Sequence, residues 1–182
     1  METFAKSLTG RLIVNLLGSG MESRFRYRFF GPEKILLGAG LLPGQIILEV
    51  GCGTGYFTLP AARMIGDAGC LVALDVLSES VDFVSQKVKA ANLRNVRVVK
   101  GDARNTGLDA GDFDAVLLLG VIPAPMLPLD RLLPEMYRVL KNSGSLAVWP
   151  PVPVWLPGSI LSSGLFRLSG KRNGVHNFQR LP

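Results

Sequence analysis

The stretch I-I-L-E-V-G-C-G-T-G-Y-F, from Ile46 to Phe57, decides the fold class of this 182-residue chain. An apolar run ends in an acid, Glu49, and three glycines then alternate with other residues: Gly51, Gly53 and Gly55. Because glycine adopts backbone angles that other residues avoid, the pattern indicates a buried strand that turns sharply into a helix and leaves backbone amides open to a ligand. A dinucleotide-binding fingerprint needs G-x-G-x-x-G, and this stretch has a tyrosine where the third glycine belongs.

The chain around this stretch alternates between patterns typical of strands and patterns typical of helices. Strands are predicted at Ile46–Val50, Cys70–Asp75, Val96–Lys100, Phe113–Leu119 and Gly144–Trp149. Helices are predicted at Pro32–Ala39, Tyr56–Ile65, Ser78–Ala91 (with Ser78 as the N-cap) and Leu129–Leu140. Repeated strand–helix–strand units predict a parallel sheet with helices on both faces. The most apolar of the strands, Phe113–Leu119, is expected at the centre of that sheet.

The C-terminal residues follow a different rhythm, in which a proline-rich link precedes two short strands. These strands are predicted at Phe166–Ser169 and Val175–Arg180, antiparallel to each other, on either side of a loop at Gly170–Gly174. The pair Asn173-Gly174 within that loop is a strong signal for a hairpin turn. His176, next to this turn, is expected to be a surface residue rather than a catalytic base.

Acidic residues come at or directly after the ends of three predicted strands. Glu49 precedes the glycine turn, Asp75 ends the second strand, and Asp102 follows the third in the sequence G-D-A. Because parallel strands bring their carboxyl ends to one edge of a sheet, we expect these carboxylates to lie close together. Asp75 taken alone could be a helix cap, and Asp102 a turn former, but their occurrence at successive strand ends favours a ligand site.

The spacing also indicates what these acids bind. A carboxylate at Asp75, 20 residues after Gly55, can accept hydrogen bonds from both hydroxyls of a ribose. Asp102 can accept a hydrogen bond from an exocyclic amine such as that of adenine. Val76 and Leu77 supply an apolar wall for the flat ring.

Several runs resemble those of class I S-adenosylmethionine-dependent methyltransferases, over about Pro32 to Trp149 and in the same order. They are L-E-V-G-C-G-T-G-Y-F, A-L-D-V, K-G-D-A, F-D-A-V-L-L-L-G and R-L-L-P-E-M-Y-R-V-L-K-N-S-G-S-L. The resemblance is closest to the small-molecule enzymes that include the ubiquinone/menaquinone methyltransferases. It implies an α/β, Rossmann-like, doubly wound sheet of seven strands, mostly parallel with a C-terminal antiparallel hairpin. We expect a single domain over residues 1–182, with a helical segment at 1–44, a cofactor-binding core at 45–149 and a hairpin region at 150–182.

The resemblance also implies the cofactor and its site. S-adenosyl-L-methionine would be bound and S-adenosyl-L-homocysteine released, with no metal. The cofactor-binding residues would be Glu49, Gly51, Cys52, Gly53, Gly55, Asp75, Val76, Asp102, Ala103 and Leu119. The glycines would hold the methionine part, Asp75 the ribose, and Asp102 with Ala103 the adenine. No catalytic residue is identified, and methyl transfer from a sulfonium needs a general base only if the nucleophile must lose a proton early.

The loops expected near the methyl acceptor are apolar. They are Leu119–Met126 and Val148–Leu161, and they favour a small apolar or amphipathic acceptor of the quinone-precursor or lipid type. Simple packing of a lid is the alternative explanation. Two other functions stay open: a nucleic-acid or protein methyltransferase that uses the basic flanks, and a cofactor-binding module without catalysis. The first loop lacks the polar-Pro-Pro-aromatic motif of DNA amino-methyltransferases, so nucleic acid is not the favoured partner.

The net charge of +6 is concentrated in the flanks of the chain. Residues 1–44 carry +3 and residues 151–182 carry +4, whereas the central part carries −1. Phe4, Leu8, Leu12 and Leu16 predict a short amphipathic helix, and the basic and aromatic segment Met21–Phe30 suits contact with a membrane surface. Ordinary charge for solubility is the alternative.

Composition limits the remaining possibilities. Two cysteines and one histidine do not make a disulfide framework or a histidine-ligated metal cluster. The N-terminus has no clear secretion signal, and the prolines within the uncharged stretch Ser143–Phe166 argue against a membrane span. We therefore expect a cytoplasmic protein, with peripheral contact to a membrane as an option, and the sequence leaves the oligomeric state undetermined.

Overall fold

The computed structural model describes residues 31–122, 128–150 and 157–182. The predictions for the N-terminal amphipathic helix and for Met21–Phe30 lie outside the described residues, as does most of the apolar loop that follows Gly120. Within the described part of the chain, no helix combines the length and the apolar character that a membrane crossing requires.

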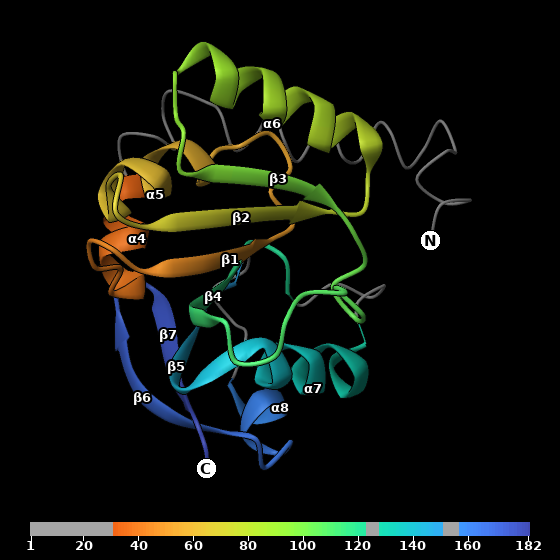
Figure 1. The fold of residues 1–182 in the computed structure, drawn as a ribbon. Helices are drawn as coiled ribbons and strands as arrows, with labels where there is room; N and C mark the ends of the chain where they lie inside the picture. Colours follow the sequence, from red (N-terminus) through yellow and green to blue (C-terminus); the bar gives the residue numbers. More distant parts are fainter. Residues whose placement is uncertain (1–30, 123–127, 151–156) are drawn as a thin grey trace.

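Seven strands form one sheet in the order β3-β2-β1-β4-β5-β7-β6 (Figure 1). They are β1 (Ile46–Val50), β2 (Cys70–Asp75), β3 (Val96–Lys100), β4 (Phe113–Leu119), β5 (Leu140–Trp149), β6 (Phe166–Arg172) and β7 (Val175–Arg180). β1 to β5 pair in parallel, whereas β7 is antiparallel to both β5 and β6. The predicted fold class is confirmed, and β4 is the central strand as expected.

The described helices are α4 (Pro32–Ala39), α5 (Thr58–Ile65), α6 (Ser78–Ala90), α7 (Leu129–Val139) and α8 (Gly158–Leu161). Alternate side chains of each buried strand face opposite sides of the sheet. Ile47 of β1 packs in a cluster with residues of α4 and α5, whereas its neighbour Leu48 packs in a cluster with residues of α7 and α8. α6 lies against β2 and β3, with Val84 and Val88 buried. The sheet therefore lies between two helical layers. The helices cover its faces and leave open the edge where the strands end.

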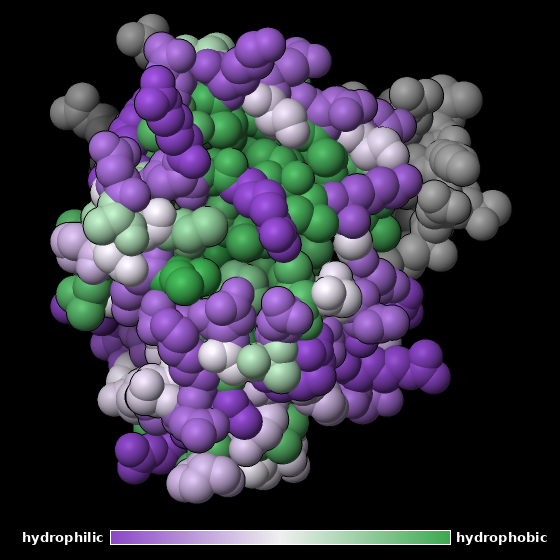
Figure 2. All heavy atoms as spheres, viewed as in Figure 1, coloured by the Kyte–Doolittle hydropathy of each residue, from purple (hydrophilic) through white to green (hydrophobic). Residues whose placement is uncertain are grey.

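The connection from β3 to β4, residues 101–112, contains turns and an isolated bridge but no helix. Figure 2 shows hydrophobic residues over β1 to β3 on the side seen in Figure 1, ringed by hydrophilic residues. The connection at residues 101–112 carries Asp102, so the candidate adenine-binding residue lies on a loop rather than on a helix.

Two local predictions about turns and caps are wrong. β6 continues to Arg172, so the loop expected at Gly170–Gly174 is only a two-residue turn, in which Asn173 and Gly174 have φ of 51° and 81°. Positive φ at both positions is the geometry of a tight hairpin turn, and pairing with β7 extends β6 into the expected loop. Ser78 is not the N-cap of α6: Leu77 takes that position, and no side chain caps the helix there.

Four element boundaries also differ from the sequence prediction. α6 ends at Ala90 rather than Ala91. α5 begins at Thr58, after the turn residues that carry the glycine motif to Phe57. α7 ends at Val139, and β5 begins at Leu140 rather than Gly144. Leu140 pairs with Phe113, and the register then shifts before Ser145 pairs with Ala115. The extra residues form an irregularity that no periodicity in the sequence signals.

Candidate functional site

The glycine turn after β1 has the conformation that its sequence predicts. Gly51, Gly53 and Gly55 have φ of 74°, 52° and 77°, a region that side-chain-bearing residues rarely occupy. The amides of Gly51 and Cys52 donate to the carbonyl oxygen of Leu74 at 2.8 and 3.1 Å, which ties the turn to the end of β2. The amides of Gly53 and Gly55 donate to Asp75 and to the carbonyl oxygen of Cys52, so the prediction that these amides are open to a ligand is wrong. A Cβ atom at Gly51 would stand 3.3 Å from the side chain of Val121. The turn is thus closely packed where it meets the end of β4.

Asp75 links this turn to α6. Its carboxylate accepts hydrogen bonds from the amide of Gly53 at 2.9 Å and from the amide of Leu77 at 3.0 Å. The bond to Leu77 means that Asp75 also helps to order the start of α6, so the structural and the ligand-binding interpretations are compatible. Burial of the residue, which is 8% exposed, raises the pKa of the carboxyl, and the neighbouring backbone amides oppose that rise.

Glu49 lies deeper than a residue at the strand edge would. It is 2% exposed, and its carboxylate accepts a 2.6 Å hydrogen bond from the hydroxyl of Thr58, the first residue of α5. Burial raises the pKa of Glu49 to about 8, Thr58 lowers it, and the nearby charge of Asp75 raises it further. Burial and the charge of Asp75 therefore both favour the neutral, protonated form of Glu49.

Asp102 lies beside the end of β2, as expected. The amide of the preceding Gly101 donates to the carbonyl oxygen of Asp75 at 2.9 Å, so the loop leaves β3 next to the ribose candidate. Ala103 is buried against the core. The carboxylate of Asp102 is engaged by Arg104, whose hydrogen bonds are the main cause of the lowered pKa of Asp102. Arg104 was not among the predicted site residues, although it follows Asp102 by two positions.

The loop that carries Asp102 is anchored to α7 by Glu135. The carboxylate of Glu135 accepts hydrogen bonds from the amide and the hydroxyl of Thr106, at 2.8 and 2.6 Å, and from the guanidinium of Arg138. Arg138 also donates to the carbonyl oxygen of Leu108 at 2.7 Å. These groups, led by Arg138, lower the pKa of Glu135 to about 2. This network was not predicted from the sequence, because Thr106 and Leu108 are about 30 residues from the residues of α7 that bind them.

The end of β4 supplies apolar side chains to the same edge. Leu119 and Ile122 are buried, and Val121 lies against Gly51. Gly120, between them, donates its amide to the carbonyl oxygen of Trp149 at 2.8 Å. The structure therefore brings the ends of β1, β2, β4 and β5 together around the glycine turn, as the sequence predicts.

A model of the methyltransferase domain matches residues 47–144, which is more than half of the chain and includes every predicted cofactor-binding residue. The chain belongs to the methyltransferase domain family. Within this family it falls among class I S-adenosylmethionine-dependent methyltransferases of the menaquinone-methyltransferase-like group, which confirms the resemblance seen in the sequence.

Two relatives and one solved structure place this methyltransferase domain more closely. It is 29% identical over 136 residues to a demethylmenaquinone methyltransferase of Lactobacillus johnsonii, a match covering 74% of this chain and 52% of that protein. It is 34% identical over 119 residues to a demethylmenaquinone methyltransferase of Listeria welshimeri, covering 62% of this chain and 49% of that protein. The chain thus spans about half the length of these curated relatives. The crystal structure of a SAM-dependent methyltransferase from Aquifex aeolicus has a TM-score of 0.75 and 27% identity, and covers 89% of this chain and 95% of that one.

The residues of the methyltransferase domain fit an S-adenosylmethionine-type cofactor. Each oxygen of a carboxylate has two lone pairs, so Asp75 keeps acceptor capacity for a ribose hydroxyl beyond its bonds to Gly53 and Leu77. A methyl group on Gly51 would intrude between the turn and Val121, so that turn needs glycine for shape as well as for φ. Cys52 is buried, and burial raises the pKa of its thiol, so it is a packing residue and not a nucleophile. Val76, a predicted part of the apolar wall for adenine, is half-buried beside Asp75.

His176 does not lie on the surface, contrary to the sequence prediction. It is 7% exposed on β7, where it pairs with Val148 of β5, and burial lowers its pKa. The prediction placed His176 in a loose hairpin, whereas β7 is an internal strand of the sheet between β5 and β6.

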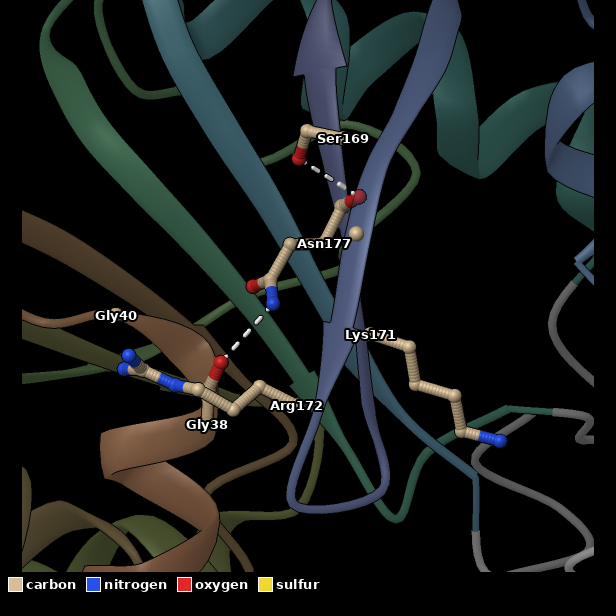
Figure 3. Close-up of a pocket in the computed structure, with 7 residues that line it drawn as sticks. Gly38, Gly40, Ser169, Lys171, Arg172 and Asn177 are labelled. Atoms are coloured by element: carbon tan, nitrogen blue, oxygen red, sulfur yellow. Dashed lines mark hydrogen bonds between the residues drawn. The ribbon is translucent and has the colours of Figure 1, made fainter.

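A pocket of about 290 Å³ lies between the end of α4 and the β6–β7 hairpin, away from the glycine turn (Figure 3). In Figure 3 the side chain of Asn177 points to α4, where its amide donates to the carbonyl oxygen of Gly38 at 2.9 Å. Asn173 donates likewise to Lys34 at 2.7 Å, and Arg172 donates to Leu37. The bond from Asn177 satisfies a carbonyl group, that of Gly38, which the C-terminal end of a helix leaves without an intrahelical partner. The pocket is therefore a seam where the hairpin holds α4, and its position does not suit the cofactor.

Proposed function

We propose that this chain is an S-adenosylmethionine-dependent methyltransferase that acts on a small apolar or amphipathic acceptor, of the quinone-precursor or lipid type. The observation that carries the proposal is the hydrogen bond between the Asp75 carboxylate and the amide of Gly53. It joins a candidate ribose-binding acid and a candidate methionine-binding turn into one unit at the edge where parallel sheets bind ligands.

The residues of this edge would divide the cofactor between them. The glycine turn would lie against its amino-acid part, Asp75 would accept from its ribose, and Asp102 with Ala103 would hold its adenine. When bound, S-adenosylmethionine supplies a methyl group on a positively charged sulfur, which needs no further activation as a leaving group. The remaining task of the protein is to align the acceptor and to exclude water. The apolar side chains of Leu119, at the end of β4, and of Val121, which lies against the glycine turn, suit that task.

Two lines of support favour an apolar acceptor. First, Leu119, Val121 and Trp149 give the strand ends beside the glycine turn an apolar character. Second, relatives of about 30% identity carry the name demethylmenaquinone methyltransferase. Because this chain spans about half of their length, the acceptor of those proteins is a proposal for this one.

Two measurements, made one after the other, test the proposed function. Isothermal titration with S-adenosylhomocysteine first asks whether the site binds the cofactor product. Release of S-adenosylhomocysteine from S-adenosylmethionine is then followed with a short-chain demethylated naphthoquinol, a fatty acid, transfer RNA and a basic protein as acceptors. We expect turnover with the first or the second. Turnover only with the RNA or the protein would contradict the proposed acceptor, and tight binding without turnover on any acceptor would favour a non-catalytic module.

A further inference from the structure

We propose that Arg104 is a specificity-determining residue that competes with the adenine amino group of the cofactor for the carboxylate of Asp102. This inference rests on the proposed function, in which Asp102 accepts a hydrogen bond from that amine. Arg104 would then lower the affinity of the site for adenine nucleosides and reduce its preference for adenine over other purines.

The competition follows from the number of acceptor positions on a carboxylate. Asp102 accepts hydrogen bonds from three N–H groups of Arg104: the backbone amide at 2.9 Å, Nε, whose one hydrogen is shared between the two oxygens at 2.9 and 3.1 Å, and Nη2 at 2.5 Å. Two carboxylate oxygens have about four lone-pair sites in total. Three N–H groups therefore take up most of the capacity of Asp102, and the guanidinium contacts both oxygens, so an incoming amine competes with it for the same carboxylate.

Only the guanidinium can make room, because the backbone of this turn is held on both sides. Gly101 donates to the carbonyl oxygen of Asp75 at 2.9 Å, and Asn105 donates to the carbonyl oxygen of Asp102 at 3.0 Å. The side chain of Arg104, in contrast, is long and 29% exposed, and that of Asp102 is 35% exposed. A partly exposed guanidinium on a long side chain can leave its partner without any change in the fold.

The exposure also sets the size of the effect. Ion pairs between exposed side chains are weak, because water and salt screen them, so displacement of Arg104 should reduce cofactor affinity only by about two- to fivefold. The effect should also decrease with ionic strength. A purely structural role for Arg104 in the Gly101–Asn105 turn is the competing explanation, and it predicts a loss of stability without a change in base preference.

The test compares the dissociation constants of S-adenosylhomocysteine and S-inosylhomocysteine, which has a carbonyl oxygen in place of the amine. For Arg104→Met we expect two- to fivefold tighter binding of the adenosyl compound and no gain for the inosyl compound, so the preference for adenine rises by the same factor. Added salt should narrow the difference between the wild-type protein and this variant. Arg104→Lys keeps the charge but not the planar guanidinium. Its preference for the adenosyl compound should lie between those of the wild-type protein and Arg104→Met.

Two further variants serve as controls. Asp102→Asn should abolish the preference for adenine, with or without Arg104. Arg94→Met removes the same charge from an exposed position that precedes β3, at the opposite edge of the sheet, and should change neither dissociation constant. Thermal melting of each variant shows whether the fold is retained.

Three outcomes would overturn the inference. An unchanged preference for adenine in Arg104→Met would show that the two groups do not compete. Weaker binding of the adenosyl compound would show that Arg104 holds the cofactor rather than opposing it. A lower melting temperature with an equal loss for both ligands would assign Arg104 to the turn. If no folded variant binds either compound, including the wild-type protein, the proposed function itself fails.

Discussion

The carboxylate of Asp75, at the end of β2, accepts a 2.9 Å hydrogen bond from the amide of Gly53, in the turn that follows β1. The two residues are 22 positions apart in the chain. Their bond holds the glycine turn in place before any ligand arrives, and a pre-organised site loses less entropy on binding.

Asp75→Asn should weaken the binding of S-adenosylhomocysteine by roughly 10- to 150-fold. This range corresponds to about 1.5–3 kcal/mol for one hydrogen bond to a charged group. Isothermal titration measures the change, and Asp67→Asn, at an exposed position beyond α5, is the matched control that should leave affinity unaltered. An Asp75→Asn protein that binds as well as the wild type would show that the ribose assignment is wrong.

Gly51→Ala and Gly40→Ala separate backbone strain from loss of the site. Both glycines have φ of 74°, so each alanine should cost about 1–2 kcal/mol of stability. Nothing surrounds a Cβ atom at Gly40, whereas one at Gly51 would stand 3.3 Å from Val121 and beside the proposed methionine site. Denaturant unfolding should therefore show a loss for both, and titration with S-adenosylhomocysteine should show at least a tenfold loss only for Gly51→Ala. Equal affinity of the two variants for S-adenosylhomocysteine would show that the glycine turn is not part of the cofactor site.

Glu49 should make the protein less stable as the pH rises. Its folded pKa of about 8 exceeds the ordinary value of 4.5, so the folded state holds a proton that the unfolded state has released. The stabilisation is complete below pH 4.5 and is lost as the pH rises toward 8, with a slope of up to about 1.4 kcal/mol per pH unit. Asp75, whose pKa is also raised, contributes in the same direction.

Urea unfolding between pH 5 and 9 tests this dependence through a comparison of variants. Glu49→Gln keeps the shape of the side chain without its charge, so we expect a flatter profile than that of the wild type and greater relative stability at pH 9. Glu79→Gln, exposed in the first turn of α6, should leave the wild-type profile unaltered. Parallel profiles for Glu49→Gln and the wild type would contradict the raised pKa.

Glu135 should have the opposite effect at low pH. Its folded pKa of about 2 is below the ordinary 4.5, so its stabilisation is present above pH 4.5 and is lost as the pH falls toward 2. Glu135→Gln should unfold more easily at pH 7, because Arg138 loses a charged partner and the bonds to Thr106 weaken. The difference from the wild type should shrink on acidification to pH 3, as followed by urea unfolding. A constant difference across this range would mean that the charge of Glu135 is not what stabilises the loop.

Gly38→Ala should destabilise the protein although alanine is the better helix former. A Cβ atom at Gly38 would stand 2.5 Å from the backbone oxygen of Arg172, and backbone cannot move aside as a flexible side chain can. We expect a loss of about 1–3 kcal/mol, as for overpacking in a core. Gly158→Ala, at the start of α8 with open space around it, should be neutral or slightly stabilising. A stable Gly38→Ala protein would show that the hairpin does not pack tightly on α4.

The sequence by itself determined the order of strands and helices and the class of the sheet. Strand and helix periodicity is local, and the apolar run at Phe113–Leu119 was enough to place β4 at the centre. The glycine turn was predictable for the same reason, since positive φ at Gly51, Gly53 and Gly55 is a property of single residues. The proximity of Asp75 and Asp102 followed from the rule that parallel strands end at one edge.

Only the tertiary structure decided which polar groups form hydrogen bonds with one another. The bonds of Glu135 to Thr106, of Asn173 to Lys34 and of Asp75 to Gly53 join residues far apart in the chain, and no pattern of spacing identifies such partners. The same holds for the burial of His176, which depends on β7 lying between β5 and β6. Periodicity shows which face of an element is buried. The partner of a polar group depends on distances that arise only when the whole sheet has formed.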